Sequence, residues 1–546
     1  MSAPKFEVRS LLPVITIASS AVCITPYWNL EPIHLPRLFL ASLLAAASVS
    51  ILIFQNSKLS IGELKSSRNL HLVGILCVIA IVMFSTLIFN DVDIQRQVFG
   101  GQGRLNGLLA NLFLILIFIA IAISPFNIKT RLWDFTFMFG GGFNLIYGYL
   151  QVYGLDPVNW QNPYGPVVGT MGNPNFMSSL LAFFGIYLLT VIIFRSEIGI
   201  PTRLIYLGLL LAVVNLIRET GSIQGYFVLL SALFITAAVK LRMEKNYKLL
   251  IGTLLIVPFI SILLAVGLTG RGLLGEVLFQ STLKVRTYYW QAALQMIYER
   301  PLFGFGFDSY GDWYRSFRSR EAATVHGPNL VTDSAHNILL DYGAFGGLPL
   351  LVSYLMLFIF VTFKAVKKLR EDQPSWIFIF FFTGWIGYLL QAMISIQHLA
   401  LSMWGMVFGG GLYALSTIKV PREIRVIPLK YRRLLSLLIL FLFSFAAFLP
   451  FKKDHDFREA LASNNGSNII KVARELPSND FYLTLASEIL YRNGFTDLGR
   501  SLSRDALKIN PRNYAALTLL LNDPGLNQNE QSRYKEARLL VDPYQP

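Results

Sequence analysis

The succession of apolar segments constrains this chain more than any other feature of its sequence. A helix of about 20 apolar residues is long enough to span the hydrocarbon core of a bilayer. Charged residues make up only 14% of the 546 residues, whereas a soluble domain carries roughly 25%. The sequence therefore predicts an all-α fold, a polytopic transmembrane helical bundle. About thirteen segments qualify as spans: 11–29, 37–54, 70–89, 107–124, 132–153, 176–194, 202–216, 222–239, 249–267, 347–363, 375–395, 398–417 and 433–450.

The distribution of basic residues indicates the orientation of these spans. With the N-terminus inside, 23 of the 47 Lys and Arg fall in seven inner linkers and only 4 in five short outer linkers. This bias follows the positive-inside rule and places segments 268–346 and 451–546 outside. For a multi-pass protein of a bacterial inner membrane, outside is the periplasm. Basic residues in alternate linkers are a topology signal, so the net charge of +15 does not indicate nucleic-acid binding.

The chain divides into four predicted regions. Residues 1–267 form transmembrane helices 1–9, and residues 268–346 form a large periplasmic loop that holds the catalytic site. Residues 347–450 form transmembrane helices 10–13, and residues 451–546 form a small polar helical domain. The N-terminal segment MSAPKFEVRS has no cleavage site after it and is interpreted as the start of a retained span.

The C-terminal domain is nearly neutral, with 13 Lys and Arg against 12 Asp and Glu. Its segments DALKINPRNYAALTLLL and EARLLVDPYQP look like tetratricopeptide-type helix pairs, in which an Asn-Pro or Asp-Pro step ends a helix. A small helical cap without repeats is the alternative. The two cysteines, Cys23 and Cys77, lie inside apolar segments, so neither a disulfide framework nor a cysteine metal site is indicated.

The long polar segment 284–347 carries most of the candidate chemistry. His336 is the candidate general base, because an imidazole titrates near neutrality and can accept a hydroxyl proton. A helix-capping or core histidine is the alternative interpretation. A metal site built from Asp333, His336 and His326 is a further alternative, although Asp-x-x-His with one more histidine is a weak pattern. We therefore predict no metal and no cofactor.

Three arginines near the outer face are candidates for binding a phosphorylated substrate: Arg286, Arg218 and Arg104. A guanidinium stays charged and binds phosphate oxygens through paired hydrogen bonds. Converging arginines would hold a pyrophosphate and stabilise it as a leaving group. The alternative for each is a residue that extends along the membrane surface to reach water.

Three stretches together resemble the O-antigen ligase and polymerase family. They are GNPNFMSSLLAF (172–183), RTYYWQAALQMIYERPLFGFGFDSY (286–310) and AHNILLDYGAFGGLPLL (335–351). The resemblance extends from about residue 100 to 416. It implies a bacterial membrane glycosyltransferase that uses a glycan linked to undecaprenyl pyrophosphate, without a nucleotide sugar or a metal.

The resemblance also implies roles for single residues. His336 matches the loop histidine that activates the acceptor hydroxyl, and Arg286 matches the arginine that contacts the pyrophosphate. Where the family often carries another arginine, this chain has Gly221-Ser222-Ile223-Gln224-Gly225, so Arg218 or Gln224 would substitute. Three polar residues are expected to support the site: Asn337, Asp308 and Gln224.

The sequence does not identify the acceptor of the glycan. A lipid A core would make the protein a ligase, a second lipid-linked glycan would make it a polymerase, and a protein Ser or Thr would make it an oligosaccharyltransferase. An anionic-solute transporter and a structural membrane scaffold are the non-enzyme alternatives. The expected partners are the lipid-linked glycan, an acceptor glycan, lipid or protein hydroxyl, and membrane lipid, with no nucleic acid.

Overall fold

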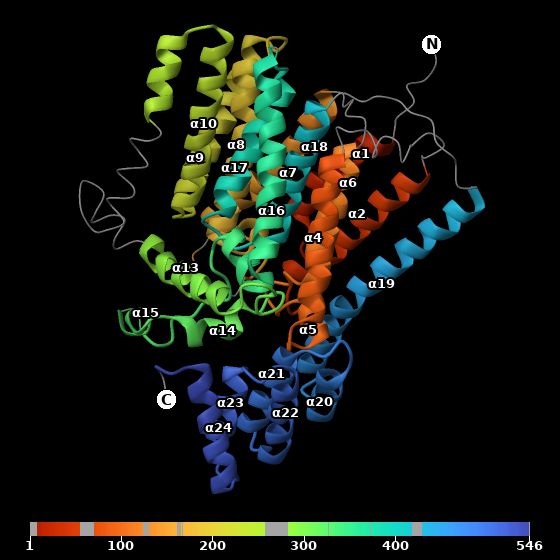
Figure 1. The fold of residues 1–546 in the computed structure, drawn as a ribbon, viewed down its shortest axis with the longest axis vertical. Helices are drawn as coiled ribbons and strands as arrows, with labels where there is room; N and C mark the ends of the chain where they lie inside the picture. Colours follow the sequence, from red (N-terminus) through yellow and green to blue (C-terminus); the bar gives the residue numbers. More distant parts are fainter. Residues whose placement is uncertain are drawn as a thin grey trace.

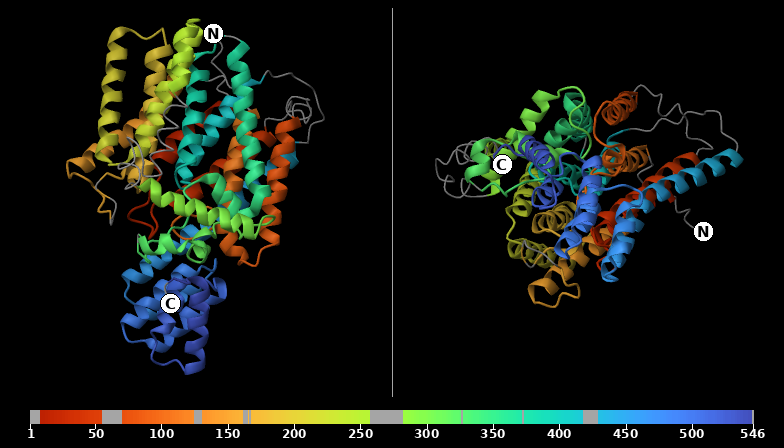
Figure 2. Two further views of the ribbon diagram at one scale, coloured as in Figure 1. Left: turned by 60° about the vertical axis from the view of Figure 1, so that its left-hand side comes forward. Right: turned by 90° about the horizontal axis from the view of Figure 1, so that it is seen from below.

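The described part of the chain is helical and contains no strand. The computed structural model describes residues 8–54, 70–123, 130–160, 165, 167–256, 282–325, 327–371, 373–417 and 429–544. A long helical bundle occupies one end of the molecule and a small helical domain the other. Between them lie the helices of the segment before α16 (Ile338–Glu371), which is called the polar loop below and whose described helices fall within residues 282–325 (Figures 1 and 2). This arrangement confirms the predicted fold class.

Each predicted span overlaps a helix of the bundle, although the ninth, 249–267, lies largely outside the described residues. Eight described helices are long and apolar enough to cross a membrane. Others, such as Trp376–Ala392, are apolar but shorter. The bundle helices are α1 (Val8–Val22), α2 (His34–Phe54), α4 (Leu70–Ile88), α6 (Leu108–Ile123), α7 (Thr130–Val152), α8 (Pro174–Phe194), α9 (Ile200–Glu219), α10 (Ile223–Met243), α16 (Ile338–Glu371), α17 (Trp376–Ala392), α18 (Leu399–Ser416) and α19 (Leu429–Ala462).

The centre of the bundle is formed by α8 and α18, which are buried along most of their length. The α8 helix begins at Pro174, within the stretch Gly172-Asn173-Pro174. Asn173 caps it by accepting a hydrogen bond from the backbone N–H of Asn175 at 2.9 Å, and Pro174 occupies the first helical turn. Proline is tolerated there because its missing N–H has no partner within the helix. This cap fixes the end of α8 that faces the polar loop.

The polar loop is fastened to a kink in α16. Helix α16 starts at Ile338, ahead of the predicted tenth span, and is interrupted by non-helical torsion angles at Gly346 and Gly347. Three backbone hydrogen bonds join the loop to this region, including one from Phe305 N to Ala344 O at 2.8 Å. At Gly304 (φ +61°), an added Cβ would lie 2.4 Å from the carbonyl oxygen of Phe345. Only glycine fits there, which explains one glycine of the FGFGF segment.

The loop helices and the C-terminal helices stack on the same end of the bundle (Figure 2). The loop contributes α13 (Thr282–Glu299), α14 (Tyr310–Phe317) and α15 (Arg320–Val325), and the segment before α6 contributes α5 (Ile94–Phe99). The C-terminal domain contains α20 (Gly466–Arg474), α21 (Asp480–Arg492), α22 (Thr496–Ile509), α23 (Tyr514–Leu521) and α24 (Gln528–Val541). Its own core includes Phe457, Tyr482, Ala486 and Leu502.

The C-terminal domain is joined to the bundle without a flexible linker. Helix α19 continues from the predicted last span to Ala462, so no break in the helix marks the predicted boundary at residue 450. A tetratricopeptide-type repeat in this domain stays a prediction.

Candidate functional site

The tight turn before α16 positions His336. This residue has a positive φ of 55°, which a side-chain-bearing residue adopts only when its surroundings enforce it. Here the Ser334 hydroxyl accepts a hydrogen bond from the His336 N–H at 3.0 Å and donates one to the Asp341 carboxylate at 2.7 Å. Asp341 also accepts from the N–H of Ala335 at 2.7 Å. The turn is therefore anchored from inside the first turns of α16.

Asn337 has a structural role at the same place. Its side-chain oxygen accepts hydrogen bonds from the N–H groups of Leu339 and Leu340, both at 3.1 Å. This is the geometry of a helix N-cap. Its amide nitrogen donates to the carbonyl of Met393 at 3.1 Å, which ties the turn to the end of α17.

Helix α13 brings Arg286 and Tyr289 to His336. The two residues are three apart and share one face of the helix. The Tyr289 and His336 rings lie 5.2 Å apart between centroids. Arg286 is only 7% exposed, and burial lowers the pKa of its guanidinium. Among the described residues, no carboxylate forms an ion pair with it. A buried, uncompensated guanidinium is costly, so this position is suited to an anionic ligand.

The electrostatics of His336 keep its imidazole neutral. Burial and the charge of Arg286 lower the pKa of His336 to about 3, and Arg104 acts in the same direction. The carboxylate of Asp333 opposes this shift. The ring is therefore able to accept a proton throughout the physiological pH range, and a nearby anion would make it more basic.

A second segment, the loop after α5, brings Arg104 to the same site. The Arg104 Nε lies 2.7 Å from an Asp333 carboxylate oxygen. Asp308 holds this loop, because its carboxylate accepts hydrogen bonds from the N–H groups of Gly101 (2.7 Å) and Asn106 (3.1 Å). Burial raises the pKa of Asp308 to about 6. Asp308 thus supports the position of Arg104, and no contact to His336 is needed for that role.

His336, Tyr289, Arg104 and Asp333 line a cavity of about 880 Å³ at the loop end of the bundle, whereas Arg286 is not among the lining residues. Its volume falls within the range of about 300–1,000 Å³ that is usual for small-molecule sites. The lining includes His336 and Tyr289, as well as Arg96 and Arg104. The lining residues from the bundle and the loops also include Asn173, Asn175, Asp308, Asp312, Arg315, Thr332, Asp333 and Ile396. The α8 cap, the loop after α5 and the turn before α16 therefore converge on one space.

Two of the predicted site residues lie elsewhere. The Arg218 side chain is 72% exposed at the end of α9 and pairs with Glu219 at 2.7 Å. Gln224 is buried in α10, where its amide nitrogen donates to the Ser179 hydroxyl at 3.0 Å. A chain of hydrogen bonds through the Ser222 hydroxyl reaches Asn175, which does line the cavity. Gln224 therefore lies behind the cavity wall.

The alternative metal site is not assembled in the described residues. His326 lies outside them, and no group of three or more His, Cys, Asp or Glu side chains is gathered for a metal among the residues that are described.

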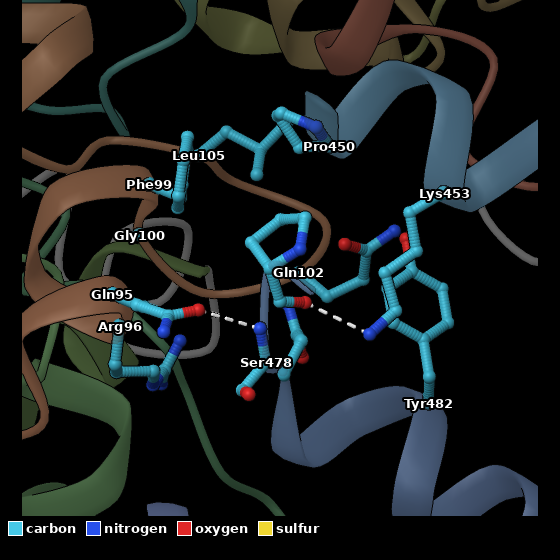
Figure 3. A pocket seen from close by; sticks show the side chains of 12 residues that line it. Gln95, Arg96, Phe99, Gly100, Gln102, Leu105, Pro450, Lys453, Ser478 and Tyr482 are labelled. Carbon is cyan, nitrogen blue, oxygen red and sulfur yellow. Dashed lines mark hydrogen bonds between the residues drawn. The ribbon is translucent and has the colours of Figure 1, made fainter. Parts of the chain in front are cut away.

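The C-terminal domain is docked directly against the α5 segment. In a small pocket at this contact, the Gln95 side-chain oxygen accepts a hydrogen bond from Ser478 N at 2.6 Å, and Lys453 Nζ donates to the Pro477 carbonyl at 2.8 Å (Figure 3). Arg96 pairs with Asp312 of α14 at 3.0 Å and lies 3.9 Å from Asp480 of α21. Arg96 therefore connects the bundle, the loop and the C-terminal domain.

Sequence reasoning did not identify several lining residues. Tyr289 could have been found from its spacing to Arg286 on α13. Asn175 was expected to be a possible cap of α8, but the N-cap is Asn173, which accepts a hydrogen bond from the Asn175 N–H. Arg96 was a candidate only as a basic residue of the outer segment 90–106. Its contact with Asp480 gave no signal, because the two residues are far apart in the sequence and meet only through docking.

A family model described as O-antigen ligase matches residues 207–355. This region runs from α9 through the polar loop into α16 and contains both Arg286 and His336. No curated protein matches the chain.

Proposed function

Residues 207–355 belong to the O-antigen ligase family, and on this premise we propose that the protein transfers a glycan from undecaprenyl pyrophosphate to an acceptor hydroxyl. The proposal depends most on one observation. His336 lines the 880 Å³ cavity, and Arg286 lies close enough to lower the pKa of its imidazole. A proton acceptor and a buried cation are the two groups that this reaction requires.

His336 acts as the general base. The acceptor hydroxyl gives its proton to the imidazole while its oxygen attacks the anomeric carbon of the glycan. The bond between this carbon and the pyrophosphate oxygen breaks at the same time, so a single displacement inverts the anomeric centre. Because the charge of Arg286 lowers the pKa of His336, a bound pyrophosphate would offset that charge and make the base stronger when the donor is present.

Arg286 binds the pyrophosphate and stabilises the charge that develops as it departs. Arg104 is the second candidate for binding the pyrophosphate. It would exchange its bond to Asp333 for a bond to a phosphate oxygen. Asp308 and Asn337 position the segments that carry Arg104 and His336. Arg286 is not itself among the lining residues, and its role rests on its burial and on its charge beside His336. Arg218 is exposed and paired with Glu219, and Gln224 is bonded to Ser179, so we assign neither of them a step in the reaction.

The helix ends support a periplasmic location for the cavity in a bacterial inner membrane. Three helices start near the cavity and carry basic residues at their far ends: α8 with Arg195, α10 with Lys240 and Arg242, and α16 with Lys368 and Arg370. Basic residues favour the cytoplasmic side of a membrane. The polyprenyl chain of the donor would then lie in lipid, with its pyrophosphate at the outer surface.

The test is glycan transfer by the full chain in nanodiscs carrying His336→Ala. We expect the rate to fall by about 10²–10⁴-fold, the usual contribution of a general base. His71→Ala is the matched control, because His71 is an exposed histidine in the first turn of α4. Transfer at the wild-type rate in His336→Ala would remove the catalytic role of this residue. A thermal melt of both variants separates loss of chemistry from loss of folding.

A further inference from the structure

The cavity has a second wall, and the C-terminal domain provides it. Helix α21 contributes Asp480, Phe481, Thr484, Leu485 and Glu488 to the lining, and the start of α23 contributes Asn513. Asp480, Thr484 and Glu488 are four residues apart, as are Phe481 and Leu485, so the five lie along one face of the helix. This face therefore lines the same cavity as His336, which belongs to the loop wall.

The two walls differ in chemistry. The bundle and loop wall carries the arginines Arg96, Arg104 and Arg315. The α21 wall combines an exposed aromatic ring, Phe481 at 38% exposure, with Leu485 and the carboxylate of Glu488. A partly apolar surface with a few polar groups is typical of ligand sites. Glu488 pairs with Arg492 through one carboxylate oxygen at 2.5 Å, and its other oxygen is suited to hydroxyl donors, because carboxylates accept hydrogen bonds only.

The second wall is held rigidly in place. The Asp542 carboxylate, after α24, accepts hydrogen bonds from Arg318 Nη2 at 2.8 and 2.9 Å and from Arg315 Nη1 at 2.8 Å. The Arg318 and Asp542 side chains are fully buried. The Arg512 guanidinium lies 3.7 Å from the centre of the Trp313 ring. These contacts fix α21 relative to the loop, so the wall is a permanent part of the cavity.

We propose that the α21 face forms the acceptor subsite and that the acceptor is a saccharide. This inference rests on the proposed function, because it uses the same cavity. The saccharide would lie with its C–H surface against Phe481 and with a hydroxyl donating to Glu488. The hydroxyl at its other end would then point across the cavity to His336.

The lining favours a saccharide over a peptide segment. Peptides are recognised through sheet edges, helix-binding grooves, aromatic proline-binding grooves or basic clusters. The described residues of the α21 wall come only from helices and caps, and their ionisable groups are acidic. A carboxylate beside an exposed ring is suited instead to a ligand that is rich in hydroxyl donors and has apolar C–H faces.

The experiment uses the full chain in nanodiscs with Phe481→Ala and Glu488→Gln. Phe495→Ala is the matched control, because Phe495 is an aromatic residue of the same domain that is 56% exposed and does not line the cavity. Saturation-transfer NMR measures binding of two probes: the oligosaccharide released from the lipid-linked donor by mild acid, and a Ser- and Thr-rich peptide. We expect Phe481→Ala to weaken oligosaccharide binding about three- to tenfold, with binding of the lipid-linked donor unchanged.

Three results would overturn the inference. They are unchanged oligosaccharide binding in both variants, preferential binding of the peptide, and loss of donor binding. None of these results bears on His336, whose variant is tested by transfer itself. If His336→Ala abolishes transfer while Phe481→Ala leaves oligosaccharide binding intact, the proposed function stands and the acceptor subsite lies elsewhere.

Discussion

The contact between Asp542 and the polar loop permits a quantitative prediction. The Asp542 side chain is fully buried and is the carboxylate partner of two arginines, of which Arg318 is also fully buried. Replacing it by Asn leaves a buried guanidinium without a counter-charge. Breaking a buried pair in this way costs about 3–5 kcal/mol, which is roughly 150- to 4,500-fold in the equilibrium between docked and undocked domain.

The lower end of this range is the better expectation. Arg318 keeps a hydrogen bond from its Nη1 to the Pro328 carbonyl at 2.8 Å. Arg315 keeps its position 4.0 Å from the centre of the Tyr514 ring. These contacts continue to hold both cations in the Asp542→Asn variant, so part of the docking energy is retained.

Hydrogen–deuterium exchange of the full chain in nanodiscs measures the effect. We expect faster exchange in α14 and α24, whereas exchange in α8 should be unchanged. Asp497→Asn is the control, because Asp497 is 88% exposed and its bridge to Arg500 lies at the surface, where such pairs contribute about 0–1 kcal/mol. The double variant Asp542→Asn with Arg318→Met removes the unpaired buried charge and should recover most of the protection. Equal exchange in α14 and α24 of wild type and Asp542→Asn would refute the reasoning.

Two further predictions concern the site. Arg286→Gln should raise the pKa of His336 above its value of about 3, because the charge of Arg286 is one cause of the low value. A histidine NMR titration measures this pKa. An unchanged or lower pKa in the variant would contradict the prediction. Gly100→Ala should destabilise the protein by at least about 1 kcal/mol, since Gly100 has φ +87° and an added Cβ would lie 2.6 Å from an Asp308 carboxylate oxygen. A thermal melt tests it, with the open position Gly74 substituted by Ala as control, and an unchanged melting temperature would argue against this packing.

The helical spans were predictable because their signal is local. A run of about 20 apolar residues specifies a helix in lipid wherever it occurs in the chain. Caps are equally local, and Asn173, directly before Pro174, caps the start of α8. The boundaries were less accurate at α16 and α19. Helix α16 starts before its apolar segment, and α19 continues beyond its own, because polar residues extend both helices outside the region that hydropathy detects.

The candidate site was predicted in part. His336 and Arg286 were identified from residue chemistry and from the resemblance, and the structure places them close together. Arg104 was predicted to bind the phosphorylated substrate, but its pairing with Asp333 was not predicted, because Asp333 is 229 residues away in the sequence. Arg218 has the same chemistry, but its position at the end of α9 leaves it exposed and outside the cavity lining.

The sequence by itself determined the class of the protein, its helices and the residue types that can perform the reaction, because these depend on neighbours within one or two helical turns. Tertiary structure alone decided which of those residues face a common cavity. It also brought α21 to the same cavity as His336, although more than a hundred residues separate them in the sequence. The contacts that do this, such as Arg96 with Asp312 and Asp480, exist only after distant segments have packed, and no local pattern in the sequence records them.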